Sequence, residues 1–187
     1  YENMIAITPD DANVRYNLGS TYFKKRMLNE AVSELQKAIN LKSDHVKARY
    51  NLGVIYMKKS MLNESIKEFQ EALKIEPTYM KAYINLGVAY YKKGIIDAAI
   101  TAYNRAIEIK QDYAEAYYNA SLAYLKKGLI EDAINLLKKG IELQPNDDSL
   151  HFLLGNAYSD NELLDEAVKE WEKTLEINPG HYKAHNN

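Results

Sequence analysis

Hydrophobic residues recur along this chain at the three- and four-residue spacing of α-helices, in segments too short to form one long helix. Leu86 and Tyr90 lie on one such stripe, and Ala99 and Tyr103 lie on a second stripe in the following segment. Between the two segments, the polar sequence around Gly94 interrupts the pattern, as expected for a tight turn. The pattern therefore predicts two helices joined by a short turn.

The same hairpin pattern recurs along the chain with a fixed period of 34. One tyrosine position repeats without a gap, at Tyr22, Tyr56, Tyr90, Tyr124 and Tyr158. A glycine position repeats at Gly19, Gly53, Gly87 and Gly155, with Ser121 in the missing place. The four prolines, Pro9, Pro77, Pro145 and Pro179, are spaced by two periods, two periods and one period, and each is expected to follow the second helix of a hairpin. A fixed period in this range predicts an array of stacked repeats.

We place five repeats in one solenoid domain, at residues 12–45, 46–79, 80–113, 114–147 and 148–181. Residues 1–11 match the second half of a truncated repeat, and residues 182–187 match the start of another. No polar capping helix follows the fifth repeat, although arrays normally end with one. Apolar residues such as Met4 and Trp171 are therefore expected to be partly uncovered, and end-to-end self-association is expected.

The stretch AYINLGVAYYKKGIIDAAITAYNRAIEIK, residues 82–110, resembles the tetratricopeptide repeat. The resemblance extends over nearly the whole chain, with mild departures such as Ser121 for glycine and Ser65 for alanine. It implies an all-α fold, a right-handed superhelical solenoid of antiparallel helix pairs. It also implies that the first helix of each pair lines a concave groove.

Composition narrows the range of functions. The chain has 24 basic and 26 acidic residues, a net charge of −2, which does not favour general binding to nucleic acid. It has no cysteine, and its four histidines are scattered, so we expect no enzyme activity, metal site or cofactor. No run of about 20 apolar residues is present and no signal peptide is recognised, so we expect no membrane insertion and a cytoplasmic location.

The groove-facing stripe of the first helices contains ordered columns of residues. Asparagine recurs at Asn17, Asn51, Asn85 and Asn119, and its amide group matches the backbone of an extended peptide. This column resembles the asparagine ladder of peptide-binding tetratricopeptide superhelices. The neighbouring columns complete the predicted partner-binding groove with Tyr16, Lys47, Tyr50, Val54, Met57, Lys58, Lys81, Ile84, Val88, Tyr91, Lys92, Tyr118 and Leu122.

Charge is distributed unevenly between the two helices of each repeat. The first fifteen residues of repeats one to four contain 13 basic residues and one acidic residue. A partner of acidic character is therefore expected in the groove. The carboxylate clamp that binds chaperone tails is not expected, because only two of its five positions match, Asn51 and Lys81.

These observations predict a protein–protein interaction scaffold that binds an extended or helical peptide of a partner protein. Two alternatives are a self-assembling structural scaffold and the targeting arm of a larger enzyme, such as a protein glycosyltransferase. RNA binding, as in the related pentatricopeptide repeats, is not expected, because the period stays at 34 and the fifth repeat is acidic.

Overall fold

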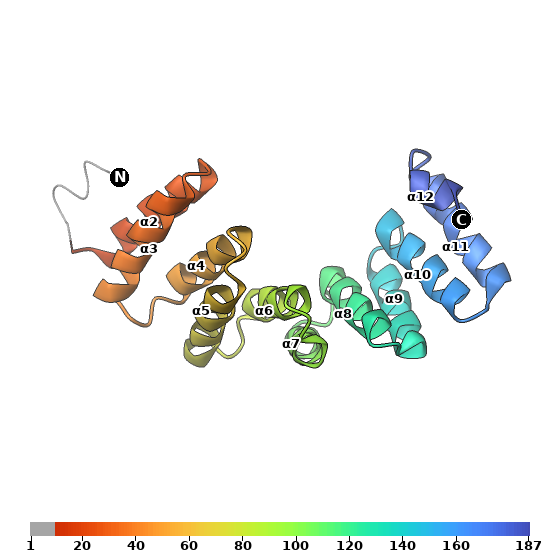
Figure 1. Ribbon diagram of the computed structural model, residues 1–187, viewed down its shortest axis with the longest axis horizontal. Coiled ribbons are helices and arrows are strands. Elements are labelled where there is room, and N and C mark those ends of the chain that lie inside the picture. The colour runs from red at the N-terminus through yellow and green to blue at the C-terminus, as the bar shows by residue number, and fades with distance from the viewer. Residues whose placement is uncertain (1–9) are drawn as a thin grey trace. The chain divides into compact units, whose positions relative to one another are not determined.

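The computed structural model describes residues 10–187, and within that range it contains helices and no strand. The chain divides into two compact units, residues 1–94 and residues 95–187. Figure 1 shows the helices following one another in chain order, each joined to the next by a short connection. The all-α class of consecutive helix pairs is confirmed, whereas the half-helix expected before Asp10 lies outside the described residues.

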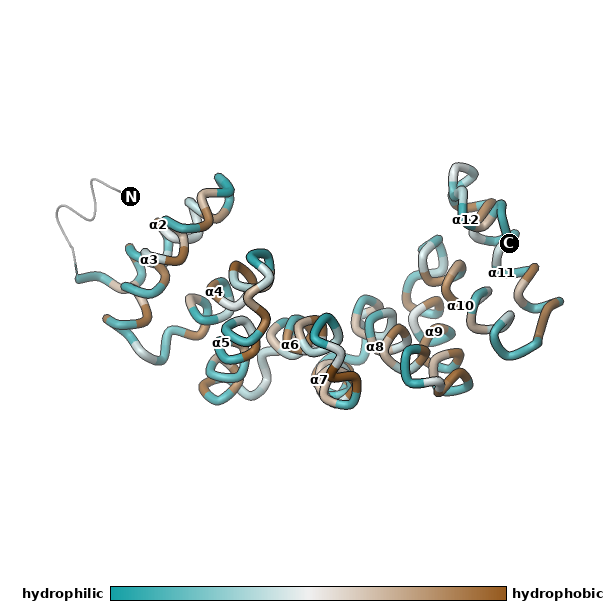
Figure 2. Tube along the Cα trace, viewed as in Figure 1, coloured by the Kyte–Doolittle hydropathy of each residue, from teal (hydrophilic) through white to brown (hydrophobic). Residues whose placement is uncertain are grey.

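The first unit contains five described helices. They are α2 (Ala12–Lys24), α3 (Leu28–Leu41), α4 (Val46–Lys58), α5 (Leu62–Ile75) and α6 (Met80–Lys92). Each packs against its neighbours in sequence, α2 on α3, α3 on α4, α4 on α5 and α5 on α6. Hydrophobic and hydrophilic residues alternate within each helix (Figure 2), which gives every helix an apolar stripe to bury.

The second unit contains the remaining helices. They are α7 (Ile96–Ile109), α8 (Ala114–Lys126), α9 (Ile130–Leu143), α10 (Asp148–Asp160), α11 (Leu164–Ile177) and the short α12 (Tyr182–His185). Packing again joins consecutive helices, from α7 on α8 to α10 on α11. The first helices of the five pairs begin at Ala12, Val46, Met80, Ala114 and Asp148, the first positions of the expected repeats.

Glycine allows the two helices of a pair to approach closely. A Cβ atom on Gly53 of α4 would lie 2.7 Å from Cε1 of Phe69 on α5, and one on Gly155 of α10 would lie 2.6 Å from Cδ1 of Trp171 on α11. Gly19 approaches Leu35 in the same way, at 2.9 Å. These contacts are too short for any side chain larger than hydrogen, so the recurring glycine is a packing residue.

The turn within each pair has a left-handed residue at the same place. Gly94 and Gly128 have φ angles of 80° and 81°, and Arg26, Ser60 and Glu162 have φ angles of 61°, 59° and 62°. The backbone N–H of the next residue donates back into the helix, as from Met61 to Tyr56 O. This is the helix end that glycine favours, although three of the five turns use another residue.

A partly buried pair of one basic residue and one glutamate ties the first helix to the second in three of the hairpins. The pairs are Arg15–Glu34, Arg49–Glu68 and His151–Glu170, with N–O distances of 2.9, 3.1 and 2.6 Å. Burial opposes ionisation of Glu34, but hydrogen bonds from Lys37 and Arg15 outweigh it and lower the pKa of this carboxyl group.

Side-chain hydrogen bonds also connect successive hairpins within a unit, from α3 to α4, from α5 to α6 and from α7 to α8. The phenol oxygens of the recurring tyrosines accept from amides 20 positions earlier, in the pairs Gln36–Tyr56, Gln70–Tyr90 and Asn104–Tyr124. Lysines donate to residues 30 positions earlier, in the pairs Lys59–Asn29 and Lys93–Asn63. The half-buried tyrosine rings therefore pack against one helix while their hydroxyl groups bind a side chain of another.

Candidate functional site

The predicted groove residues lie on α2, α4 and α6 of the first unit and on α8 of the second. The four lysines Lys47, Lys58, Lys81 and Lys92 are exposed, and the other predicted residues except Ile84 are half-buried. Ile84 is only 4% exposed, so its side chain belongs to the core and offers a ligand little surface. The sequence stripe does not reveal this difference, because Ile84 shares its helical position with Tyr16 and Tyr50.

Three of the four members of the asparagine column, Asn51, Asn85 and Asn119, make side-chain hydrogen bonds inside the protein. The Nδ2 atom of Asn51 donates to Ser20 Oγ at 3.1 Å, which links α4 to α2. The Nδ2 atom of Asn85 donates to Tyr50 Oη at 2.9 Å and to the carbonyl oxygen of Lys81 at 3.1 Å. In the second unit, Asn119 Nδ2 donates to the carbonyl oxygen of Glu115 at 2.9 Å.

These bonds fix the orientation of two of the amide groups. A carbonyl oxygen only accepts, so the atom of Asn85 or Asn119 that faces it must be the nitrogen. The oxygen then points away from the helix backbone. No described residue donates to Oδ1 of Asn51, Asn85 or Asn119, and none of these oxygens is buried without a partner. Each asparagine therefore presents a solvent-accessible acceptor.

Beside the asparagines in the first unit lies a column of stacked rings. The Tyr16 and His45 rings have centroids 4.9 Å apart, and the Tyr50 and Tyr79 rings have centroids 5.1 Å apart. Tyr50 also faces Phe69 of the core at 5.9 Å. Burial, with smaller contributions from Tyr50 and Tyr16, raises the pKa of Tyr79 to about 12, so its hydroxyl group stays protonated at neutral pH.

His45 is the most constrained member of this column. Its Nδ1 accepts a hydrogen bond from Ala48 N at 3.3 Å and so caps α4, which places the ring proton on Nε2. Nε2 is a buried polar side-chain atom that has no hydrogen-bond partner in the described part of the chain. Burial lowers the pKa of His45, with Lys42 adding to this effect, so the uncharged ring is favoured.

Two kinds of lysine end the first helices. Lys58 and Lys92 are exposed, and neither forms an ion pair with a described residue; the same is true of Lys47 and Lys81 near the helix starts. The following lysines instead bind the second helix of the preceding pair, as Lys127 does with Asp97 at 2.6 Å. The exposed lysines therefore give this face its positive charge.

The remaining predicted residues supply apolar surface. In the first unit, these are the half-buried Val54, Met57, Val88 and Tyr91, and in the second unit they are Tyr118 and Leu122. His45 and Tyr79 were not among the predicted site residues, because they lie in the connections before α4 and α6 and outside the helical stripe. Each follows its stacking partner, Tyr16 or Tyr50, at the same separation in sequence, and this recurrence is the signal that would have identified them.

Metal centres and membrane spans have recognisable structural signatures. Residues 10–187 contain no cluster of three or more histidine or carboxylate side chains that could hold a metal ion. None of the described helices combines the length and apolar character needed to cross a bilayer. The most regular polar surface of the described chain is formed by the asparagines, the stacked rings and the exposed lysines. We call these sets the asparagine column, the ring column (Tyr16, His45, Tyr50 and Tyr79) and the lysine column (Lys47, Lys58, Lys81 and Lys92).

Regular two-helix repeats, glycine-mediated packing and a constant repeat period define a helical repeat protein. A family model described as "TPR repeat" matches residues 27–60, 55–94, 89–128 and 121–162, and one described as "Tetratricopeptide repeat" matches residues 148–181. The chain therefore belongs to the tetratricopeptide repeat family. No curated protein gives a significant match.

Solved structures of this fold are numerous. A crystal structure of MamA protein has a TM-score of 0.84 at 29% identity, over 92% of this chain and 94% of that chain. A second MamA structure has a TM-score of 0.83 at 30% identity, over 89% and 97%. YrrB, described as a TPR protein with an unusual peptide-binding site, has a TM-score of 0.85 at 23% identity, over 99% and 95%. YrrB and this chain are therefore similar in fold.

Proposed function

We propose that this protein is an interaction scaffold that binds a peptide segment of a partner protein along the asparagine, ring and lysine columns of the first unit. The observation that carries the proposal is the orientation of Asn85, which the Lys81 carbonyl oxygen fixes, with Asn51 bonded to Ser20 at the same register one repeat earlier. Their nitrogens are engaged inside the first unit, and their Oδ1 atoms reach solvent. A row of fixed acceptors suits the backbone N–H groups of a polypeptide ligand.

Preorganisation makes these acceptors effective. Asn85 is held by two hydrogen bonds, and Tyr50, which accepts one of them, is itself packed between Tyr79 and Phe69. A ligand therefore does not have to immobilise the amide group when it binds, which reduces the entropy lost on association. The fold-level similarity to YrrB agrees with a peptide-binding function without locating a site in this chain.

The lysines determine the expected character of the ligand. Lys47, Lys58, Lys81 and Lys92 are exposed and lack carboxylate partners among the described residues. Attraction between these cations and acidic side chains would speed association and favour acidic segments. Val54, Met57 and Val88 offer apolar surface between them. The proposed ligand is an acidic peptide with apolar side chains, bound in an extended or helical form.

A selection experiment tests this proposal directly. A display library of random dodecapeptides is selected against the complete chain, and the affinities of enriched peptides are measured by fluorescence anisotropy. We expect the enriched peptides to be rich in Asp and Glu. The double variant Asn51→Ala/Asn85→Ala should weaken their binding tenfold or more, because each lost hydrogen bond costs about 0.5–1.5 kcal/mol.

A matched control uses asparagines of the same unit that lie on second helices. Asn29 and Asn63 accept hydrogen bonds from Lys59 and Lys93 and are outside the proposed site. Asn29→Ala/Asn63→Ala should leave peptide affinity unchanged. Failure to enrich any peptide, or equal affinities for the two double variants, would exclude the asparagine column from the mechanism.

Self-association is a second candidate function, favoured by apolar surface on the last long helix. Leu164 and Val168 of α11 are 63% and 48% exposed, whereas Ala167 is buried and Trp171 is partly covered where it contacts Gly155. Met4, the residue expected to contribute at the other end, lies outside the described residues. The partner proposed for this surface is a second copy of the chain.

Light scattering across a concentration series tests the second candidate. We expect the average mass to rise with concentration for the natural chain and to stay monomeric for Leu164→Glu/Val168→Glu. Lys169→Glu changes the charge of the same helix without removing apolar surface, so it should still associate. A monomeric mass for the natural chain at millimolar concentration would eliminate this candidate.

A further inference from the structure

A ring stacks at a fixed place in three of the five hairpins. The residue that precedes a first helix contacts the aromatic residue 29 positions earlier, in the pairs Tyr16–His45, Tyr50–Tyr79 and Phe152–His181. The ring centroids are 4.9, 5.1 and 4.5 Å apart. Each contact fills the space between the connection and the preceding first helix.

In the fourth hairpin an acidic residue stands where the second ring would be. Asp147 lies 29 positions after Tyr118 and caps α10, where its Oδ1 accepts from Ser149 N at 2.9 Å and Leu150 N at 3.2 Å. Its short side chain serves the helix end and does not occupy the volume of a ring. A hollow of about 430 Å3 lies at this place, and Tyr118 and Asp147 are among the residues that line it.

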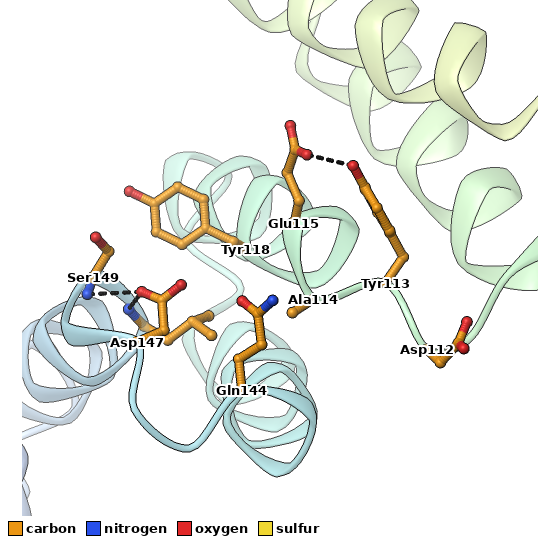
Figure 3. Close-up of a pocket in the computed structure, with 9 residues that line it drawn as sticks. Asp112, Tyr113, Ala114, Glu115, Tyr118, Gln144, Asp147 and Ser149 are labelled. Atoms are coloured by element: carbon orange, nitrogen blue, oxygen red, sulfur yellow. Dashed lines mark hydrogen bonds between the residues drawn. The ribbon is translucent and has the colours of Figure 1, made fainter.

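The hollow has the size of a ligand pocket and an acidic lining. Small-ligand pockets typically have volumes of roughly 300–1,000 Å3. Figure 3 shows the Tyr118 ring and the carboxylates of Glu115 and Asp147 around it, with Gln144 below and Tyr113 and Asp112 to one side. No lysine or arginine is among the residues that line it. The surroundings therefore favour a cation.

Two of the carboxylates are available to such a cation. Glu115 accepts a hydrogen bond from Tyr113 Oη at 2.8 Å through Oε2, and no described residue donates to its Oε1. Asp147 uses Oδ1 for the helix cap, and no described residue donates to its Oδ2. Neither forms an ion pair within the described chain, whereas Asp112 lies 3.8 Å from the ammonium group of Lys110.

We propose that this pocket of the second unit binds the guanidinium group of an arginine side chain from a partner polypeptide. The guanidinium group is planar, so it can take the volume that a ring fills in the other hairpins and lie against the Tyr118 ring. Its five N–H donors match the open oxygens of Glu115 and Asp147. A neutral ring would fill the volume and displace water from the two carboxylates, but it would offer them neither a positive charge nor hydrogen-bond donors in place of that water.

The site is distinct from the proposed acidic-peptide site of the first unit, because it selects the opposite charge. Lysine is a poorer occupant than arginine, since its compact ammonium group is more strongly hydrated and cannot stack. The two proposals can also fail separately, because small probes of this pocket do not require the asparagine column.

The experiment titrates small amides into the isotope-labelled complete chain and follows the backbone NMR signals of residues 112–118 and 144–150. The probes are Nα-acetyl-arginine methylamide, the corresponding citrulline amide, which is its neutral isostere, and the corresponding tyrosine amide. We expect saturable shifts with the arginine probe, and at least tenfold weaker binding of the other two. The shifts should diminish at roughly 0.5 M salt, because the attraction is electrostatic.

The variants remove charge while preserving structure. Asp147→Asn keeps a good helix-capping residue, and Glu115→Gln keeps an acceptor for Tyr113. The double variant should reduce affinity for the arginine probe tenfold or more. Asp11 caps α2 through the same two bonds, at 2.7 and 3.2 Å, so Asp11→Asn is the matched control and should have no effect.

Each result decides the proposal. Arginine-selective shifts that depend on Glu115 and Asp147 support it. Equal binding of citrulline, tighter binding of the tyrosine probe, or retention of affinity in the double variant would overturn it. Absence of any saturable shift with the arginine probe at tens of millimolar would also overturn it, because an isolated side chain should then not occupy the hollow.

Discussion

His151 on α10 and Glu170 on α11 form a close pair, with Nδ1 of the imidazole 2.6 Å from Oε2 of the carboxylate. The second ring nitrogen, Nε2, lies 3.0 Å from the carbonyl oxygen of Pro145. Both ring nitrogens therefore face oxygen atoms, one on the neighbouring helix and one in the connection before α10. The pair has the same separation in sequence as Arg15–Glu34 in the first hairpin.

This relationship predicts which residues can replace His151. Arg49, at the corresponding place in α4, donates to Glu68 and also to the carbonyl oxygen of Ser43, six positions earlier. His151→Arg should therefore retain stability, whereas His151→Leu should lose about 1.5–3 kcal/mol, because it removes hydrogen bonds to a charged group. Urea unfolding of the three proteins checks this. A leucine variant as stable as the natural chain would show that the pair contributes little.

The left-handed turn residues predict substitutions that stabilise the protein. Ser60 and Glu162 have φ angles of 59° and 62°, and this conformation costs a residue with a Cβ atom roughly 1–2 kcal/mol. Ser60→Gly and Glu162→Gly should each raise the free energy of unfolding by about 1 kcal/mol. Gly128→Ala should lower it by a similar amount, although a Cβ atom there would meet nothing within 4 Å. Thermal melting of the three variants provides the measurement, and shifts of the opposite sign would contradict the backbone explanation.

The helical glycines predict a loss of stability for a different reason. Gly53→Ala would place Cβ 2.7 Å from the Phe69 ring, so the two helices must separate or the ring must move. We expect a destabilisation of about 1–3 kcal/mol from overpacking. Phe69→Leu in the same protein should recover part of the loss by making room. No recovery in the double variant would mean that the cost does not arise at this contact.

His45 predicts a dependence of stability on pH. Burial lowers its pKa from the ordinary value of 6.5, so the unfolded chain binds a proton more readily than the folded chain. The stability that the uncharged His45 ring gives the folded state is therefore fully present above about pH 6.5. It is lost as the pH falls through the lowered pKa of His45 in the folded state. Protonation of Nδ1 would also remove the hydrogen bond from Ala48 N that caps α4.

Urea unfolding between about pH 7.5 and pH 4.5 measures this effect against His45→Asn. Asparagine also caps helices and does not titrate in this range, so the variant serves as a matched control. The natural chain should lose more stability on acidification than the variant. Parallel pH profiles for the two proteins would rule out His45 as a contributor.

Much of the fold was predictable from the sequence, because the same local signals recur in every repeat. The helix starts follow the apolar stripe, and Pro77, Pro145 and Pro179 each lie two residues beyond the last residue of a helix. Gly53 and Gly155, which share one position in the repeat, both lie where two helices approach closely. A weak signal repeated several times in one chain becomes a strong one.

The site was less predictable, because its details depend on contacts between repeats. The stripe placed Ile84 beside a ligand, but its side chain is buried. The sequence also does not reveal that the nitrogen of Asn85 donates to Tyr50 Oη. It is this bond that leaves the oxygen of Asn85 facing solvent as an acceptor. The sequence gives no direct sign that Asp147 lines a pocket, because an aspartate that caps a helix is common at this position.

The fixed spacing of the contacts between hairpins bears on how such a protein can evolve. Amide–phenol bonds and lysine bonds each join positions at a constant separation in successive hairpins of the same unit. Duplication or deletion of one whole repeat therefore preserves the separations in sequence at which these bonds form. A single residue inserted within a helix would shift the residues that follow it out of register with the preceding hairpin, and the bonds between those two hairpins would then be lost. Recombination in whole repeats is thus the inexpensive genetic route by which this array can change its length and the order of its ligand-facing residues.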